Sequence, residues 1–345
     1  MLCLIGSRTT VAERKGYLES ILAEYMKRKQ DVADALQVEL GAPKLFAENV
    51  QANMFPMHIS TVIKLADTYE WSEDQGKTLV VKEPVGVVGA ITPWNWPLNQ
   101  IAAKLGPALL AGCTFVLKPS EVTPINAFIV AEAIHASGLP KGVFNMVCGT
   151  GLNCGEVLAT HPKVDMVSFT GSTKVGRMLH AKGAATVKRV RTELGGKSAT
   201  VVLADATPAQ IKLMASNVLG NTGQSCNALS RLLAPRSRYD EVVAIAKAAF
   251  DGAKVVEASD PSAKMSDLGP LSSQMQYDKV TGYIKQGIAE GARLVSGGPE
   301  RPAGVNPSGY FVKPTLFADC TNQMSIAREE IFGPVLTIIP QATTP

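Results

Sequence analysis

The sequence predicts an α/β protein in which a parallel sheet is covered by helices on both faces. Short apolar segments rich in β-branched residues alternate with segments of helical periodicity from Val85 to Thr192, and the same rhythm resumes after Glu193. Such alternation is typical of parallel sheets, because each strand is followed by a helix that crosses back over the sheet. With 345 residues, the chain has the length of two such domains.

The part of the chain before this alternation is predicted to be helical. Leu18, Ile21, Leu22 and Tyr25 repeat at the spacing of one helix face. Gly41 then ends the stretch that follows, as glycines commonly do after helices.

The alternating region gives a definite order of elements. We expect strands at 85–92, 114–118, 143–147, 166–170 and 188–192, and helices at 98–110, 124–137, 153–159 and 173–184. In sheets of this kind, ligands bind beyond the carboxyl ends of the strands. The polar segments that follow 92, 118 and 170 are therefore candidate ligand-binding loops.

A second pattern of strands and helices follows Glu193. We expect strands at 199–202 and 229–233, helices at 208–218 and 239–250, and a surface loop rich in glycine and proline at 297–308. The domain boundary is placed near Thr192, which divides the chain into residues 1–192 and 193–345.

The composition is that of an ordinary soluble globular protein, with 46% apolar and 19% charged residues. The net charge of +4 is small, and we interpret the basic cluster at 27–29 as a solvated helix face. The apolar run in Met1–Arg8 is too short for the core of a signal peptide, and no later run is long enough to span a bilayer. We therefore expect a cytoplasmic protein without nucleic-acid or membrane partners.

The cysteines fit neither a disulfide framework nor a zinc site, because no CxxC pair occurs and the chain has only 4 histidines. We expect a reducing compartment and no metal site. The 6 cysteines are Cys3, Cys113, Cys148, Cys154, Cys226 and Cys320.

Cys226 is the candidate nucleophile, because glycine and small polar residues precede it in Gly223-Gln224-Ser225-Cys226 and leave room for a substrate. The alternative is a small core residue. No histidine lies near it in the sequence, which argues against a cysteine–histidine dyad.

Glu193 is the candidate general base. It ends a predicted strand and precedes Gly195-Gly196, so we expect a carboxylate on a mobile, uncrowded turn. Burial there would raise its pKa toward neutrality and suit it to accept a proton. The alternative is a solvated carboxylate in a surface turn.

Three loops at strand ends carry further polar groups. Thr170–Gly176 opens a helix whose free N–H groups suit a phosphate, although the same residues are common as helix caps. Lys118 and Glu121 suit the hydroxyls of an adenosine ribose, with a plain surface turn as the alternative. The Asn95 amide suits a developing oxyanion, although asparagine is also common in turns.

In this order and together, six segments resemble the aldehyde dehydrogenase superfamily. The resemblance covers nearly the whole chain and implies the aldehyde dehydrogenase fold, with a Rossmann-like coenzyme-binding domain at 1–192 and an α/β catalytic domain at 193–345. The segments are Pro93-Trp94-Asn95, Lys118-Pro119-Ser120-Glu121, Phe169-Thr170-Gly171-Ser172, Glu193-Leu194-Gly195-Gly196-Lys197, Gly223-Gln224-Ser225-Cys226 and Glu329-Glu330-Ile331-Phe332-Gly333-Pro334-Val335.

The resemblance implies an oxidoreductase that converts an aldehyde to a carboxylic acid. Cys226 would form a thiohemiacetal and then a thioester, with Asn95 and the Cys226 N–H as the oxyanion hole. Glu193 would activate the hydrolytic water, and Lys104 would relay protons.

The resemblance also implies a coenzyme, NAD, with NADP as the alternative. Glu121 favours NAD, because a carboxylate there would repel a 2′-phosphate. The implied coenzyme-binding residues are Ile91, Thr92, Trp94, Lys118, Glu121, Gly171, Ser172, Gly176, Leu194, Gln276, Lys279, Glu330 and Phe332.

Members of the superfamily carry strands before their first helices and continue well beyond the counterpart of Ile339. We therefore expect a chain truncated at both ends, with an incomplete catalytic domain. Residues 76–84 resemble the oligomerisation hairpin of the family, whose full-length members would form homodimers or homotetramers.

Two alternative functions stay open. One is a CoA-acylating semialdehyde dehydrogenase, although that branch generally lacks a glutamate at the place of Glu193. The other is a non-catalytic fragment or pseudoenzyme that binds NAD. The sequence does not identify the aldehyde.

Overall fold

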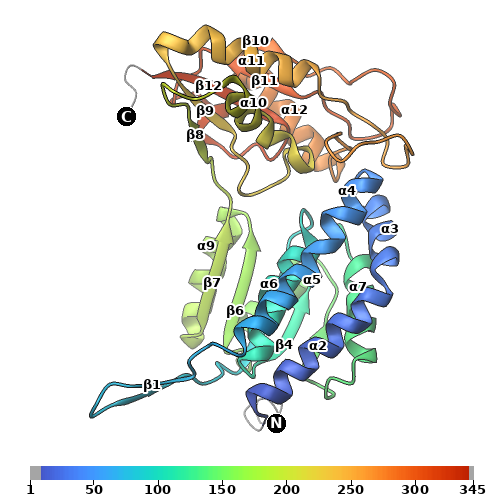
Figure 1. Cartoon of the computed structure of the whole chain (residues 1–345), viewed down its shortest axis with the longest axis vertical. Helices are drawn as coiled ribbons and strands as arrows, with labels where there is room; N and C mark the ends of the chain where they lie inside the picture. The colour runs from blue at the N-terminus through green and yellow to red at the C-terminus, as the bar shows by residue number, and fades with distance from the viewer. Residues whose placement is uncertain (1–8, 342–345) are drawn as a thin grey trace. The chain divides into compact units, whose positions relative to one another are not determined.

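The computed structural model describes residues 9–341, which form two compact units (Figure 1). The first unit runs to Glu39 and resumes from Ala47 to Leu194, and the second comprises Leu40–Phe46 and the chain from Gly195 onward. The division thus falls after Leu194 rather than at Thr192, and 40–46 belongs to the second unit. The expectations for Met1–Arg8 and for the last four residues lie outside the described part of the chain.

The first unit is built on a five-stranded parallel sheet with the order β5-β4-β3-β6-β7. The chain leaves β3 in one direction to β4 and β5, and later returns to add β6 and β7 on the other side. Ligands in such sheets bind where the strand order reverses, at the carboxyl ends. The strands are β3 (Val87–Ile91), β4 (Thr114–Lys118), β5 (Phe144–Met146), β6 (Met166–Gly171) and β7 (Arg189–Leu194).

Helices cover both faces of this sheet, because right-handed crossovers in opposite directions place their helices on opposite faces. Helix α6 (Pro97–Leu110) packs on β3 and β4, and α9 (Thr173–Gly183) packs on β6 and β7. Leu158 of α8 (Glu156–Thr160) completes the core on the α9 side. The predicted parallel arrangement is confirmed.

A helical layer precedes the sheet, as the sequence predicts. Its members are α2 (Val11–Lys27), α3 (Lys29–Leu40), α4 (Lys44–Asn49) and α5 (Met54–Leu65), and α7 (Ile125–Ala136) packs against α2. Helix α2 begins with a capping box formed by Thr10 and Glu13. Its buried Tyr25 stacks on Phe55 at 4.4 Å between ring centroids, so the predicted apolar face is the packing face.

An exposed antiparallel hairpin connects this layer to the sheet. It pairs β1 (Ser72–Asp74) with β2 (Leu79–Val81), and the Gln75 N–H donates to the Thr78 carbonyl at 2.8 Å to close the turn. The hairpin therefore begins before the predicted range 76–84, because its first strand consists of polar residues that give no apolar signal.

The second unit has a five-stranded sheet with the order β10-β11-β12-β9-β8, in which only β10 is antiparallel to its neighbour. Strand β12 is buried on both faces, with Leu336 and Ile338 in one core cluster and Val335 and Ile339 in the other. The strands are β8 (Ala199–Val201), β9 (Arg231–Pro235), β10 (Arg293–Ser296), β11 (Thr315–Ala318) and β12 (Val335–Gln341).

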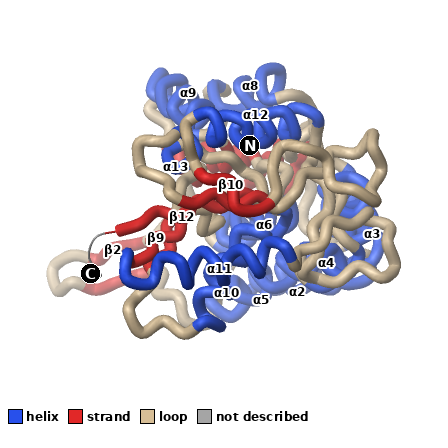
Figure 2. Tube along the Cα trace, turned by 90° about the horizontal axis from the view of Figure 1, so that it is seen from above, coloured by secondary structure: helices blue, strands red, loops and turns tan. Residues whose placement is uncertain are grey.

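Helices again cover both faces of this sheet (Figure 2). Helices α10 (Pro208–Ser216) and α11 (Tyr239–Asp251) supply one core cluster, and α12 (Gln274–Ala289) and α13 (Ser325–Arg328) supply the other.

Two boundaries near Cys226 differ from the sequence prediction. Helix α10 stops at Ser216, and the 3-10 segment η4 (Asn217–Gly223) follows it. Strand β9 begins at Arg231 instead of 229, because the preceding residues form turns such as the Ala228 N–H bond to the Ser225 carbonyl, 3.1 Å. The backbone around Cys226 is thus more irregular than the apolar pattern predicts.

Candidate active site

Lys118 and Glu121 form an ion pair at the carboxyl end of β4. The Lys118 side chain is 3% exposed, and its Nζ lies 2.6 Å from Glu121 Oε2. Burial alone would raise the pKa of Glu121. The hydrogen bond and charge of Lys118, with smaller contributions from the main chain of Glu121 and Gly151, outweigh that effect, and the pKa lies below its usual value. The result is an oriented, ionised carboxylate that can accept bonds from ligand hydroxyls.

The loop between β6 and α9 has the form that suits an anion. Gly171 ends β6, and Ser172 caps α9 by accepting the Val175 N–H at 3.4 Å. The remaining first-turn N–H groups and the helix dipole favour negative charge there. Gly176 lets α9 approach β7, since a Cβ on it would lie 2.7 Å from Leu194 Cδ2. Gly176 and Leu194 therefore have a packing role in this unit.

The turn between β3 and α6 carries Asn95. Ile91 ends β3, and the Thr92 N–H donates to the Lys118 carbonyl at 3.1 Å, which joins this turn to the end of β4. Asn95 is buried, and its main-chain carbonyl accepts from Gln51 Nε2 at 3.1 Å. Trp94 lies in the same turn.

Lys104 and Glu193 line one pocket of about 720 Å³ in the first unit. Lys104 Nζ donates to Thr170 Oγ1 at 2.8 Å. Burial lowers the pKa of Lys104 to about 8, and the charge of Glu193 offsets part of that effect. A lysine with this pKa exchanges protons near neutral pH.

The structure corrects the expected setting of Glu193. The residue lies inside β7, paired with Thr170 of β6, and not in the glycine turn that follows. Its side chain is exposed, so the burial expected from the sequence is not found within the first unit. The physical reason is that β7 keeps pairing with β6 as far as Leu194.

In the second unit, Cys226 follows a loop of unusual backbone. Asn221, Thr222 and Gly223 are consecutive residues with positive φ, at 52°, 55° and 73°. A Cβ on Gly223 would overlap the main chain of Gly333. Gly223 is therefore required both by its conformation and by the close approach of two backbones.

Hydrogen bonds hold this loop in place. Asn221 Nδ2 donates to the Gln224 carbonyl at 3.1 Å, and the Ser272 N–H donates to Gln224 Oε1 at 3.0 Å. Thr222 Oγ1 donates to the Gly269 carbonyl at 3.2 Å. Cys226, partly exposed, is thus presented from a loop that is fixed on several sides.

Glu330 lies over the double glycine that follows β7 in the sequence. A Cβ on Gly195 would overlap the Glu330 carboxylate, and the Gly196 N–H donates to Glu330 Oε1 at 3.3 Å. Burial raises the pKa of Glu330, and the charges of Lys279 and Lys197 oppose that shift. This close contact explains Gly195, whereas a Cβ on Gly196 would meet nothing within 4 Å.

Phe332 and Gln276 complete the set of predicted residues in the second unit. Phe332 has a φ of 64°, a left-handed conformation rare for a bulky residue. Gln276 Nε2 donates to the Phe332 carbonyl at 2.6 Å and fixes this segment. The second unit thus brings Gln276 together with residues from three of the six predicted segments.

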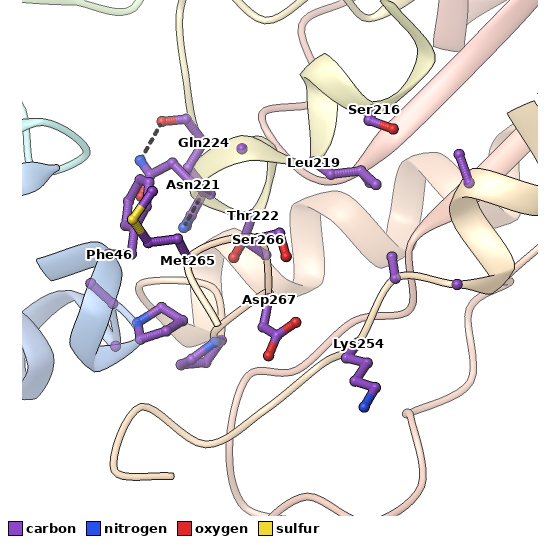
Figure 3. A pocket seen from close by; sticks show the side chains of 18 of the residues that line it. Phe46, Ser216, Leu219, Asn221, Thr222, Gln224, Lys254, Met265, Ser266 and Asp267 are labelled. Atoms are coloured by element: carbon purple, nitrogen blue, oxygen red, sulfur yellow. Dashed lines mark hydrogen bonds between the residues drawn. The ribbon is translucent and has the colours of Figure 1, made fainter. Parts of the chain in front are cut away.

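A pocket of about 490 Å³ lies beside the Cys226 loop within the second unit (Figure 3). Its lining combines apolar side chains such as Phe46, Leu219 and Met265 with Gln224, which stands two positions before Cys226. The sequence did not indicate this pocket, because separate segments near 40–46, 212–224, 248–254 and 265–270 line it.

The structure therefore groups the predicted residues into two sets, each within its own unit. Within residues 9–341, no helix combines the length and apolar character needed to cross a bilayer. The same residues contain no group of three or more His, Cys, Asp or Glu that could hold a metal ion. The residues of the first unit are Ile91, Thr92, Trp94, Asn95, Lys104, Lys118, Glu121, Gly171, Ser172, Gly176, Glu193 and Leu194, and those of the second are Cys226, Gln276, Lys279, Glu330 and Phe332.

The family model for the aldehyde dehydrogenase family matches residues 6–344. The chain belongs to the aldehyde dehydrogenase family. It is 48% identical over 336 residues to a 3-succinoylsemialdehyde-pyridine dehydrogenase from a Pseudomonas species. The matched region covers 97% of this chain and 70% of that protein. The resemblance seen in the sequence is confirmed.

Solved aldehyde dehydrogenases share the fold. The structure from Bartonella henselae has a TM-score of 0.95 and 42% identity, over 99% of this chain and 71% of that chain. A mutant aldehyde dehydrogenase from Pseudomonas syringae, solved with NAD+ and octanal, has a TM-score of 0.94 and 40% identity, over 98% of this chain and 69% of that one. The predicted aldehyde dehydrogenase fold is confirmed.

Proposed function

We propose that this aldehyde dehydrogenase oxidises an aldehyde to a carboxylic acid with NAD+, using Cys226 as the nucleophile. The observation that carries the proposal is the packing of the Cys226 loop against Gly333, next to a Glu330 cradled by Gly195. Several residues with strained backbone conformations hold the loop that carries this one thiol, and such local strain is typical of active sites. The Pseudomonas syringae relative, in which a cysteine is replaced by alanine, was solved with NAD+ and octanal.

The residues fit an NAD coenzyme. Lys118 and Glu121 would hold the adenosine ribose, since an ionised carboxylate accepts bonds from both hydroxyls and repels a 2′-phosphate. Gly171 and Ser172, at the N-terminus of α9, would hold the pyrophosphate.

The nicotinamide end would be held by the second set of residues. Glu330 would bind the ribose, with Gln276 and Lys279 in support and Phe332 beside the ring. Ile91, Thr92 and Trp94 would line the coenzyme near the end of β3. When bound, the nicotinamide accepts the hydride that the reaction releases.

The chemical steps follow from the side chains of this chain. The Cys226 thiolate attacks the aldehyde carbon, and the Asn95 amide and the Cys226 N–H stabilise the oxyanion of the thiohemiacetal. Loss of hydride leaves a thioester on Cys226. Glu193 takes a proton from water, which attacks the thioester, releases the carboxylic acid and restores the thiolate. Lys104 returns the proton to solvent, because a pKa of about 8 lets its side chain both accept and release a proton near neutral pH.

The pocket beside the Cys226 loop offers room for the rest of the aldehyde. Its apolar lining, including Leu219 and Met265, suits hydrocarbon, while Ser216 and Asn221 suit a polar substituent (Figure 3). A panel of test aldehydes should therefore vary both in length and in the presence of a polar end.

We also propose that the chain assembles into a homodimer or homotetramer through the β1–β2 hairpin. Leu79 and Val81 of this hairpin are 63% and 57% exposed. Exposed apolar side chains on a strand of a two-stranded hairpin, whose outer edge is unpaired, favour pairing with another chain.

Cys226→Ala and Glu193→Gln test the mechanism. Cys226→Ala should abolish aldehyde-dependent NADH formation while NAD binding persists. Glu193→Gln should give one equivalent of NADH per chain and then stall, because the thioester forms but is not hydrolysed. The mass of the peptide that contains Cys226 should rise by one acyl group.

Matched controls are Cys148→Ala and Glu83→Gln, which change an exposed thiol and another carboxylate of the same pocket as Glu193. Undiminished turnover by Cys226→Ala would rule the proposal out. NAD binding without NADH formation by the unmodified chain would favour the non-catalytic alternative, and acceleration of Glu193→Gln by CoA alone would favour acyl transfer.

A further inference from the structure

The loop after β5 carries two cysteines that the proposed chemistry does not use. Cys148 is exposed, and Cys154 is partly buried. A Cβ on Gly149 would lie 2.8 Å from Cys154 Cβ and 3.8 Å from its Sγ. The Cys154 thiol therefore lies against the residue that follows Cys148.

A tight turn brings the two ends of this loop together. The Asn153 N–H donates to Thr150 Oγ1 at 3.2 Å, and the Cys154 N–H donates to the Thr150 carbonyl at 3.0 Å. These bonds start the π-helical segment η2 (Gly151–Gly155) and fold residue 154 back over residue 149. The fold thus brings Cys154 back to the start of the loop, beside the residue that follows Cys148.

The same loop is bonded to the Lys118–Glu121 pair. The Gly151 main chain contributes to the lowered pKa of Glu121, so the loop lies close enough to that carboxylate to stabilise its charged form. Burial raises the pKa of Cys154, and the charges of Lys118, Cys148 and Glu121 all act on it. The two thiols, the ammonium and the carboxylate therefore form one cluster at the carboxyl end of β4.

We propose that Cys148 and Cys154 form a reversible disulfide that weakens coenzyme binding at Lys118 and Glu121. The effect on binding rests on the function proposed above for that pair. A disulfide holds its Cβ atoms within about 3.5–4.5 Å, so its formation fixes residues 148 and 154 against each other and constrains the intervening turn, which contains Gly151. The change moves the Gly151 main chain relative to the Glu121 carboxylate and so weakens its support of the charged form.

The oxidant is a hydroperoxide, and the two thiols supply two electrons. The thiolate of the exposed Cys148 attacks the peroxide, the O–O bond breaks, an alcohol or water leaves, and Cys148 becomes a sulfenic acid. The Cys154 thiol gives up its proton and its sulfur attacks the sulfenic sulfur, the S–O bond breaks, and the departing hydroxide takes that proton and leaves as water. A dithiol reverses the reaction by two exchanges, and the exposure of Cys148 gives it access.

The experiment uses the full chain with Cys226→Ala, which removes the catalytic thiol but keeps coenzyme binding measurable. One sample is reduced with dithiothreitol and one is treated with hydrogen peroxide. Trypsin releases residues 142–163, which contain both cysteines of the pair and no other. Peptide mass and calorimetric NAD titration are then measured on each sample.

We expect the oxidised peptide to lose the mass of two hydrogen atoms, and the NAD dissociation constant to rise roughly tenfold, within the usual range for coupled sites. By linkage, saturating NAD should lower the equilibrium constant for disulfide formation, measured against a dithiol buffer, by the same factor. Adding Cys148→Ser or Cys154→Ser should leave the NAD affinity of the dithiothreitol-treated protein unchanged. Either substitution should also remove the change in affinity that peroxide causes.

Three results would overturn the inference in distinguishable ways. If no mass is lost although reduced protein binds NAD, the pair does not form and the proposed function stands. If the disulfide forms but the NAD affinity is unchanged, the proposed effect of the disulfide on coenzyme binding is wrong. If the reduced protein binds no NAD although the disulfide forms, the assignment of Lys118 and Glu121 to coenzyme binding fails. The proposed effect of the disulfide on that binding then fails with it.

Discussion

The two units present their candidate site residues by different structural means. In the first unit, Lys118 and Ser172 stand at regular strand–helix junctions, where ordinary caps and one ion pair fix them. In the second unit, Cys226 and Phe332 belong to irregular backbone with positive φ at or near each of them. Lys118 and Ser172 in the first unit thus depend on an ion pair and a helix cap, whereas the Cys226 loop in the second unit depends on a glycine whose Cβ would overlap another backbone.

The irregular backbone has an energetic cost. A non-glycine residue in the left-handed region costs on the order of 1–3 kcal/mol, and it persists only where the surroundings fix it. Asn221 and Thr222 both have that conformation, and bonds to Gln224 and Gly269 hold them. The backbone contact of Gly223 should therefore tolerate substitution less well than the side-chain contact of Gly176 in the first unit.

The largest effect is expected for Gly223→Ala. The new Cβ would overlap the Gly333 main chain, and alanine is disfavoured at a φ of 73°. Since a backbone neighbour cannot rotate away, we expect the free energy of unfolding to fall by about 3–5 kcal/mol. Urea titration followed by circular dichroism measures the change.

The matched control is Gly220→Ala, three positions earlier in the same segment. Gly220 has a φ of −55°, and nothing lies within 4 Å of a Cβ placed on it. Its substitution should change stability by less than about 1 kcal/mol. Equal effects of the two substitutions would contradict the view that backbone contact with Gly333 makes Gly223 necessary.

The same contrast explains how much the sequence could predict. Strand and helix alternation indicated the parallel sheet of the first unit, and the carboxyl ends of β4 and β6 do carry the Lys118 and Gly171 loops. Local rules suffice there, because a strand end and a helix cap are defined by neighbouring residues. The Lys118–Glu121 pair is such a local feature, three positions apart.

The second unit could be predicted less well, because its contacts join distant segments. No periodicity relates Gly223 to Gly333 or Gly195 to Glu330, and only the family resemblance grouped these residues. The secondary structure at Glu193 differs from the prediction. The two glycines that follow it indicated a turn, whereas pairing between β6 and β7 extends to Leu194. The roles of Cys226 and Glu193 in catalysis stay predictions for the experiment above.

The second prediction concerns the charge pair on which the first unit depends. Lys118 is 3% exposed and Glu121 is 49% exposed, so the two partners are not equivalent. Glu121→Ala leaves a buried ammonium without its carboxylate and should lower the free energy of unfolding by about 1–3 kcal/mol. Lys118→Met keeps the apolar stem and leaves a carboxylate that water can reach, so its effect should stay below about 1 kcal/mol.

Thermal and urea unfolding of both variants measure this asymmetry. Glu132→Ala, which removes one partner of an exposed pair with Arg28, is the control and should change stability by less than about 1 kcal/mol. A larger loss in Lys118→Met than in Glu121→Ala would show that burial of Lys118 does not decide the energetics of the pair.

The smallest expected effect is a pH dependence shared by both units. Burial lowers the pKa of Lys104 in the first unit and of Lys197 in the second to about 8 each, from 10.5. Below pH 8 each lysine is charged in both the folded and the unfolded state, and the folded state carries the cost of the buried charge. Between about pH 8 and 10.5 the folded state loses the proton first, so stability rises with pH from this group.

Lys104→Met and Lys197→Met should therefore each raise the free energy of unfolding at pH 7 by about 1–2 kcal/mol, and the gain should vanish by about pH 10.5. Lys104→Met should gain less, because it also loses the Nζ bond to Thr170 Oγ1 at 2.8 Å, whereas the Lys197 Nζ is buried without a hydrogen-bond partner among the described residues. Urea titrations of each variant and the parent at pH 7, 9 and 10.5 give the difference directly. A difference that does not vary with pH would mean that shape rather than buried charge separates methionine from lysine, and the two units would then differ only in backbone.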